Sequence, residues 1–319
     1  MTTNPHDPDS TTDQNLDTAR HLKPPPFIYW IMAGAIWAIV YLRPTINAVI
    51  LMLHPLPDGQ LPWASNTEKA LETAAIALVG VAVTCGLLKL SGFSLTGAGI
   101  LPRRNRREWF WIPAAFLMAC GADKIKDKMT DYAQAWFPNH AQTYDSQATG
   151  DDALPRLLID MLIAGPAEEI MLVPGLILLL VAGRCPLWLA TTIAVAARAA
   201  FHLYYGAPVV AGYIVWALLL VVIWQITGTA LGAVAAHALN NLIAALSRTP
   251  GTDTSTLHLF DTVSGIAGIF LLLWLIPHAA RTFRDLKATS TPGHRRTHLT
   301  NCPPITASLS HNPPKEAAA

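Results

Sequence analysis

The chain has 319 residues, of which 52% are hydrophobic and only 13% are charged, and its formal net charge is +1. A soluble domain carries about 25% charged residues, so this composition argues against a water-soluble protein, and the net charge indicates no particular partner. Several apolar runs reach the roughly 18 residues that a helix needs to cross about 30 Å of hydrocarbon. We therefore predict an all-α, polytopic membrane helix bundle.

The apolar runs divide the chain into three parts. Residues 1–26 and 281–319 are polar and rich in proline and threonine, so we predict disordered tails there. Residues 27–280 are predicted to form one transmembrane helical domain, with its polar motifs in residues 154–247. The predicted spans, about eight in number, are residues 27–53, 70–90, 109–122, 154–182, 187–205, 208–226, 229–246 and 261–279.

Two charged segments separate these spans. Residues 103–107 contain four arginines, and such a cluster between spans is typical of a cytoplasmic anchor rather than of a nucleic-acid patch. Residues 123–152 form a mixed-charge connector, whose first part we expect to extend the third helix out of the membrane. Eight spans place both termini on one side, and the arginine bias of the short loops favours the cytoplasm. We expect no nucleic-acid partner.

Two adjacent glutamates, Glu168 and Glu169, lie near the middle of the fourth predicted span, where Asp160 is the one other acid. An ionised carboxylate at the bilayer centre costs at least about 2.5 kcal/mol, so intramembrane acids are functional-site hypotheses. Adjacent residues on a helix point roughly 100° apart. We therefore expect that the two carboxylates do not aim at one atom, and that one faces a cavity while the other holds a neighbouring helix.

The later spans supply further polar groups. Arg198 and His202 lie four residues apart in the fifth span, and His237 and Asn241 lie four apart in the seventh. Each pair is thus expected to share a helical face. Because lipid cannot satisfy polar side chains, the fourth, fifth and seventh helices are predicted to meet around these groups. Asn240 is interpreted as a helix-to-helix hydrogen-bonding residue.

A carboxylate, two imidazoles and an amide around a water molecule indicate hydrolysis. A glutamate in a partly dry site can act as general base toward water, and a histidine can orient it or relay the proton. A second histidine and an amide can donate hydrogen bonds to an oxyanion. We expect no cofactor. The alternative is zinc bound by Glu168, His202 and His237, although the motif HExxH is absent.

The two acids begin a motif that is known from one family. EExxxR is the first motif of the CPBP (CAAX protease and bacteriocin-processing, or Abi) intramembrane proteases, which include the eukaryotic prenyl-protein endopeptidases. The chain resembles this family over roughly residues 154–247: Glu168 and Glu169 match the motif, and Val173 stands in the place of its arginine. Our hypothesis is that Arg198, at the aromatic place of the second motif, FxxxH, supplies the missing cation to Glu169.

The second and third family motifs follow in order. FxxxH aligns on His202, and HxxxN is matched in full by His237 and Asn241. The resemblance implies that Glu168 activates water and that His202 assists it. It further implies that His237 and Asn241 form the oxyanion hole, with Glu169 as a structural support.

We therefore expect an intramembrane endopeptidase that hydrolyses a peptide bond at a membrane-embedded site. Its expected partners are the lipid bilayer and a peptide or membrane-protein substrate. We expect a multi-pass protein of a bacterial plasma membrane with both termini in the cytoplasm. Val173 supports one alternative, a catalytically degenerate scaffold or immunity-type protein of the same fold. An ion-coupled transporter with Glu168 and His202 as a relay is the other, although we find no matched pair of broken helices.

Overall fold

The computed structural model describes residues 24–54, 67–102, 109–137, 167–247 and 253–289, together with positions 159 and 163. All regular secondary structure in these residues is helical, which confirms the all-α prediction. Several predictions fall outside the described residues: those for the outermost tails, for the basic cluster at residues 103–107 and for Asp160.

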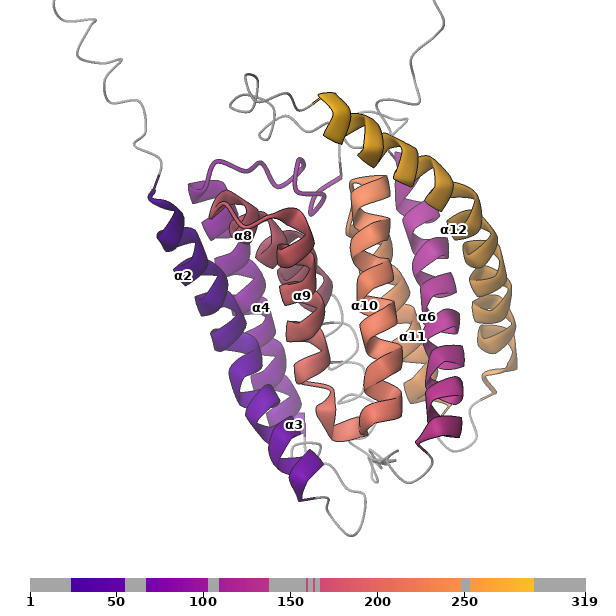
Figure 1. Cartoon of the computed structure of the whole chain (residues 1–319). Coiled ribbons are helices and arrows are strands. Elements are labelled where there is room, and N and C mark those ends of the chain that lie inside the picture. The colour runs from indigo at the N-terminus through magenta and orange to yellow at the C-terminus, as the bar shows by residue number, and fades with distance from the viewer. Residues whose placement is uncertain are drawn as a thin grey trace, which may run out of the picture.

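The long helices run up and down in one bundle, and α2 begins at the end of the bundle where α12 ends (Figure 1). The elements are α2 (Pro26–Trp37), the π-helical turn η2 (Ala38–Leu42), α3 (Arg43–Leu53), α4 (Thr67–Leu90), α6 (Trp111–Trp136), the π-helical turn η3 (Met171–Gly175), α8 (Leu176–Ala182), α9 (Leu187–Ala200), the 3₁₀ turn η4 (Leu203–Tyr205), α10 (Ala207–Thr227), α11 (Leu231–Leu246) and α12 (Ser255–Thr289). A short α-helical stretch, residues 167–170, leads into η3 and carries both glutamates.

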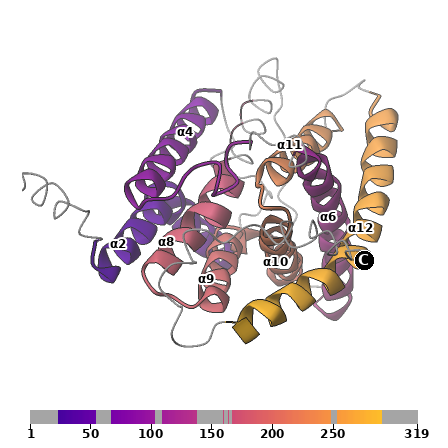
Figure 2. The same ribbon diagram turned by 90° about the horizontal axis from the view of Figure 1, so that it is seen from above.

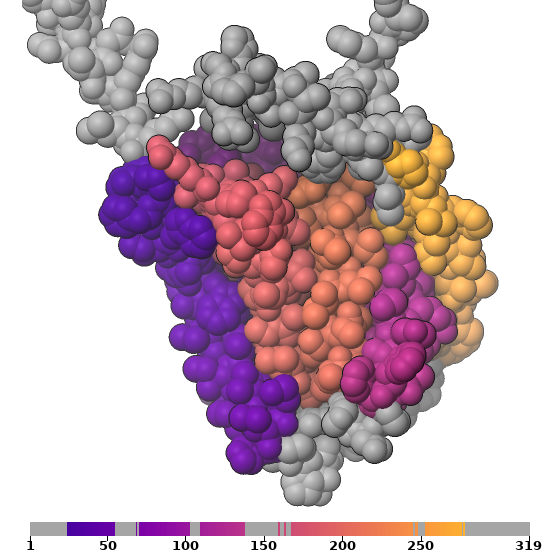
Figure 3. Space-filling view, in the orientation of Figure 1, coloured from indigo at the N-terminus to yellow at the C-terminus, as the bar shows by residue number. Residues whose placement is uncertain are grey.

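The bundle has two halves, and each half has its own apolar core. One core is built mainly from α2, α4, η3, α8 and α9, and the other from α6, α10, α11 and α12. Figures 1 and 2 show these two groups of helices side by side. The halves meet where α9 packs against α10, and the side chains of these two helices adjoin on the face shown in Figure 3. The predicted site residues lie on both sides of this junction.

Four helical segments are long and apolar enough to cross a membrane: Pro26–Leu53, Ala70–Leu90, Ala207–Thr227 and Ser255–Leu275. Leu187–Ala200 and Leu231–Ala244 are apolar but shorter. A bundle of membrane-type helices is therefore confirmed, whereas the predicted number of eight spans is not. The third predicted helix continues through the charged residues 123–128, as expected, and α6 ends at Trp136. α12 likewise runs beyond residue 280, with Pro277 inside it.

Two prolines lie within continuous helical segments next to π-helical turns. Pro44 is in the first turn of α3, directly after η2, and Pro174 lies inside η3. A proline ring clashes with the carbonyl group four residues earlier and offers no N–H to it. A π-helical turn has a longer hydrogen-bonded ring, which relaxes this clash and lets the helix continue. The first span therefore stays helical from Pro26 to Leu53, and the glutamates are followed directly by η3.

α6 is the central helix of the second half, and glycines bring three neighbours close to it. A Cβ atom on Gly232 of α11 would overlap the backbone of Phe116, and one on Gly268 of α12 would overlap the carbonyl oxygen of Leu117. Gly212 of α10 similarly faces the backbone carbonyl of Lys126. Small residues at such contacts let membrane helices pack backbone to backbone. The glycines thereby fix how closely the polar side chains of α6 approach α10, α11 and α12.

We predict that Gly268→Ala destabilises the protein by about 1–3 kcal/mol, because the added methyl group forces α12 away from α6. Gly86→Ala in α4 is the matched control, since nothing lies within 4 Å of a Cβ there, and alanine suits a helix interior better than glycine. Thermal unfolding in detergent measures both variants. Equal melting temperatures for Gly268→Ala and the native chain would contradict the close packing.

Candidate active site

Arg198 joins the two glutamates in the interior of the bundle. Its side chain, near the end of α9, is 1% exposed. Nη1 donates to Oε2 of Glu169 at 3.0 Å and Nη2 donates to Oε1 of Glu169 at 2.5 Å, while Nη2 also reaches Oε2 of Glu168 at 3.1 Å. The pairing with Glu169 is bidentate, which is the strongest geometry between a guanidinium group and a carboxylate. The predicted contact between Arg198 and Glu169 is therefore present.

One expectation about the glutamates is wrong. Both carboxylates aim at the same atom, Nη2 of Arg198, because the planar guanidinium group is wide enough to bridge side chains that leave the helix in different directions. The two acids nevertheless differ in environment. The side chain of Glu169 is 0% exposed and holds two donors of Arg198, whereas that of Glu168 is 17% exposed and holds one.

His237 connects the second half of the bundle to this ion pair. Nδ1 of His237, on α11, lies 2.8 Å from Oε1 of Glu169. The indole ring of Trp216, on α10, fills the space beside both groups: the guanidinium carbon of Arg198 lies 4.2 Å above its centroid, and the ring of His237 meets it edge-on at 5.0 Å. Glu169 thus accepts hydrogen bonds from Arg198 in one half and from His237 in the other.

His202 lies beyond the end of α9 and not on its face. The helix ends at Ala200, and the backbone N–H of His202 donates to the carbonyl oxygen of Ala199 in a tighter turn. The expectation that His202 shares a helical face with Arg198 is therefore wrong. The reversal at Gly206, whose φ of 85° favours glycine, requires this tightening before α10 begins.

The ring of His202 is buried in an aromatic cluster. It stacks on Tyr213 of α10 with centroids 3.8 Å apart, and Tyr213 in turn meets Trp216 edge-on at 5.7 Å. Neither ring nitrogen of His202 has a hydrogen-bond partner among the described residues. The structure therefore links His202 to Arg198 and His237 through two aromatic rings and shows no direct bond to Glu168.

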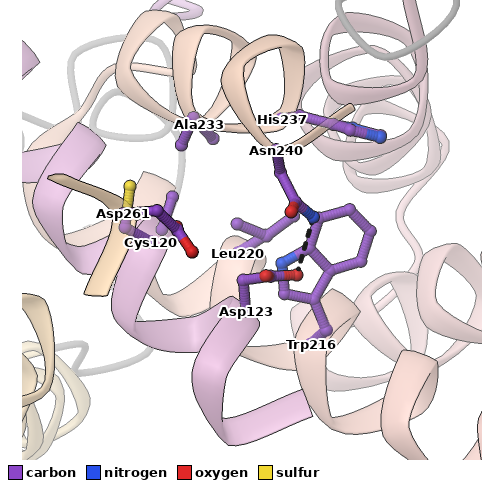
Figure 4. A pocket seen from close by; sticks show the side chains of 10 residues that line it. Cys120, Asp123, Trp216, Leu220, Ala233, His237, Asn240 and Asp261 are labelled. Carbon is purple, nitrogen blue, oxygen red and sulfur yellow. Dashed lines mark hydrogen bonds between the residues drawn. The ribbon is translucent and has the colours of Figure 1, made fainter. Parts of the chain in front are cut away.

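The two asparagines of α11 have different surroundings. Asn241 lies one turn beyond His237 and is half-buried, and it forms no hydrogen bond with the other predicted site residues. Asn240 donates from Nδ2 to Oδ1 of Asp123 on α6 at 3.0 Å, as Figure 4 shows. The interpretation of Asn240 as a helix-to-helix hydrogen-bonding residue is thereby confirmed.

Sequence reasoning missed the part of α6 that borders the site. Asp123 is buried and also accepts a hydrogen bond from Nζ of Lys126 at 2.6 Å, and Lys124 pairs with Asp261 of α12. Residues 123–128 were expected to extend the helix out of the membrane. The structure shows that Asp123 is buried and that Lys126 is largely buried, whereas Asp127 and Lys128 are exposed. The spacing of Asp123 and Lys126, three residues apart, was the available signal for a pair that satisfies itself on one helical face.

A small pocket lies between α6, α10, α11 and α12. Asp123, Asn240, His237 and Asp261 are among its lining residues (Figure 4). Its cavity volume is about 10 Å³, which is room for about one water molecule. The pocket therefore places a small, mostly apolar space with a few polar side chains next to His237 in the second half of the bundle.

The described residues contain no group of three or more His, Cys, Asp and Glu side chains that could hold a metal ion. Within this part of the chain, the three side chains of the zinc alternative have other neighbours: Glu168 is paired with Arg198, His237 with Glu169, and His202 lies on Tyr213. Whether the protein uses a metal stays open as a prediction.

A bundle with several apolar helices long enough to cross a membrane is consistent with an integral multi-pass membrane protein, and this one buries a network of an arginine, two carboxylates and a histidine in its interior. Residues 150–243, less than half of the chain, match the model of the family described as Type II CAAX prenyl endopeptidase Rce1-like, and over these residues the chain is similar to that family. The resemblance expected from the motifs is confirmed. We found no match to the chain among curated proteins or among solved structures.

We predict that Arg198→Met destabilises the protein by about 3–5 kcal/mol, because it leaves two buried carboxylates without their cation. The stability of Arg198→Lys should lie between that of Arg198→Met and that of the native chain, since lysine restores the charge but not the bidentate geometry. Lys128→Ala is the control, because its pair with Asp131 is exposed and such pairs contribute about 0–1 kcal/mol. Unfolding in detergent is the measurement, and an unaffected Arg198→Met variant would contradict the structural role.

Proposed function

We propose that this chain is an intramembrane endopeptidase of the CPBP type, in which Glu168 activates a water molecule to attack a peptide bond. The observation that carries the proposal is the inequality of the two acids within the family domain. Glu169 is fully buried and saturated by Arg198 and His237, whereas Glu168 is partly exposed and held by one donor. Glu168 is therefore the carboxylate that a water molecule can reach and that can accept its proton.

The histidines and Asn241 take the remaining roles in this proposal. Nδ1 of His237 faces Glu169, so Nε2 is the nitrogen that remains for a substrate oxygen. When the ring carries both protons, Nε2 can donate to the oxyanion, together with the amide of Asn241 one turn away. The ring nitrogens of His202, which have no partner among the described residues, are available to pass the proton to the leaving amine.

We predict that Glu168→Gln abolishes proteolysis, with a loss of at least about 10²-fold, because glutamine cannot accept the proton of water. The native chain and the variant would be expressed in the same cells, and new protein N-termini in the membranes would be compared. Glu72→Gln is the matched control, since Glu72 is exposed on α4. Fragments that persist in the Glu168→Gln cells would remove Glu168 as the base.

A second candidate function is a catalytically degenerate membrane scaffold or immunity-type protein. Two observations favour it: Val173, at the motif's arginine position, is buried in the apolar core, and Arg198 pairs with Glu168 as well as Glu169. A scaffold binds its partners through its folded surface, so it does not depend on Glu168 as a general base. The same Glu168→Gln cells separate the two candidates, because a scaffold keeps its cellular phenotype and shows no difference in fragments.

We further propose that both termini face the cytoplasm of a bacterial plasma membrane. The start of α2 and the end of α12 lie at one end of the bundle (Figure 1), which supports a common side for both. Single cysteines introduced at Thr2 and Ala318 in a cysteine-free chain should react with a membrane-impermeant maleimide only after the cells are lysed. Labelling of either position in intact cells would contradict this orientation.

A further inference from the structure

Three buried polar atoms of the first helical segment have no hydrogen-bond partner among the described residues: Nε1 of Trp37, the hydroxyl of Tyr41 and Oγ1 of Thr45. They follow one another at intervals of four residues, from the end of α2 through η2 into α3. This spacing places them on one face of the helix, and all three can donate a hydrogen bond. Buried polar groups within a membrane protein ordinarily find a partner, so a row of three among the described residues is a candidate ligand-binding face.

This face of the helix is turned toward the site. The ring of Tyr41 stacks on Phe201 at 4.7 Å with an interplanar angle of 16°, and Phe201 directly precedes His202. Tyr41 also belongs to the same apolar cluster as Ala167, the residue before Glu168, and α3 packs against η4. The two ring nitrogens of His202 also have no partner in this part of the chain. Unpartnered polar atoms therefore lie on Tyr41 and His202, the two neighbours of the Phe201 ring, in the half of the bundle that carries Glu168.

Resting on that proposed function, we infer that Tyr41 and Thr45 bind the backbone of the peptide substrate, which lies extended along the first helix beside Glu168. Residues four apart on a helix are about 6 Å apart along its axis. In an extended peptide, carbonyl groups on the same side are about 6.6 Å apart. Two hydroxyl donors at this spacing fit two such carbonyls, and Nε1 of Trp37 continues the row. Contacts to the backbone position a substrate without selecting its side chains.

The burial of the Tyr41 and Thr45 hydroxyl groups favours binding of a peptide backbone. A donor that is shielded from water keeps its strength for the ligand, because the surrounding medium has a low dielectric constant. Entry of a peptide requires the first segment to bend away from its neighbours. η2 and Pro44 lie at Tyr41, and π-helical turns and prolines are the sites where helices bend.

The test uses the full chain in lipid vesicles and isosteric variants that delete one hydroxyl each, Tyr41→Phe and Thr45→Val. Tyr132→Phe and Thr192→Val are the matched controls, since both residues are exposed on other helices. The probe is a set of short, palmitoyl-anchored fluorescent peptides of mixed sequence. Cleavage is measured in the otherwise native chain, and binding is measured by fluorescence anisotropy in chains that also carry Glu168→Gln.

We expect Tyr41→Phe and Thr45→Val each to weaken peptide binding by about tenfold, which is the value of one hydrogen bond, and to lower kcat/KM by a similar factor. Their melting temperatures should not fall, because neither hydroxyl has a hydrogen-bond partner among the described residues to lose. The controls should change binding by less than about twofold.

Each outcome decides between the two proposals. If both hydroxyl variants bind and cleave the peptides as the native chain does, the inference is overturned, and water is left as the ligand of Trp37, Tyr41 and Thr45. The inference is also overturned if the native chain binds none of the peptides. A third outcome separates the two proposals. If the hydroxyl variants bind the peptides more weakly, but cleavage survives Glu168→Gln or is absent from the native chain, Glu168 is not the base and the inference about peptide binding is supported.

Discussion

The guanidinium group of Arg198 is the interaction on which the rest of the structure depends. Two adjacent carboxylates in an apolar helix repel each other and lose their hydration. The planar fork of Arg198 holds both of them, and Trp216 covers its face at 4.2 Å. This single cation therefore fixes the position of α9 against the helical stretch that carries Glu168 and Glu169.

The same ion pair joins the two apolar cores. Glu169 receives Arg198 from the first half and His237 from the second, so the junction between α9 and α10 contains a polar centre inside an otherwise apolar contact. A carboxylate with that many donors is occupied as a structural element. Its neighbour Glu168 has one donor and is partly exposed. Their environments alone therefore make Glu169 a structural residue that joins helices and Glu168 a candidate base.

The charged part of α6 extends this polar layer across the second half. Asp123 is held by Lys126 from its own helix and by Asn240 from α11, and glycines on the neighbouring helices bring their backbones against α6. Charges that are paired within the bundle do not require the helix to leave the membrane. The pattern of charge along residues 123–128 alone could not distinguish paired from solvated side chains, because the partners Asn240 and Asp261 lie more than a hundred residues away.

The sequence determined the helical, membrane-type fold, the resemblance of residues 154–247 to a family and the set of side chains worth testing, because hydrophobic run length, short motifs and charges in apolar runs are local properties. Spacing also predicted that His237 and Asn241 lie one turn apart on a single helix, which is α11. The tertiary structure decided the rest. It showed that one guanidinium group bridges both glutamates, that α9 ends before His202, and that the first helix brings Tyr41 to the site. These facts depend on where helices end and which of them meet, and contacts between segments distant in the chain leave no periodic trace in the sequence.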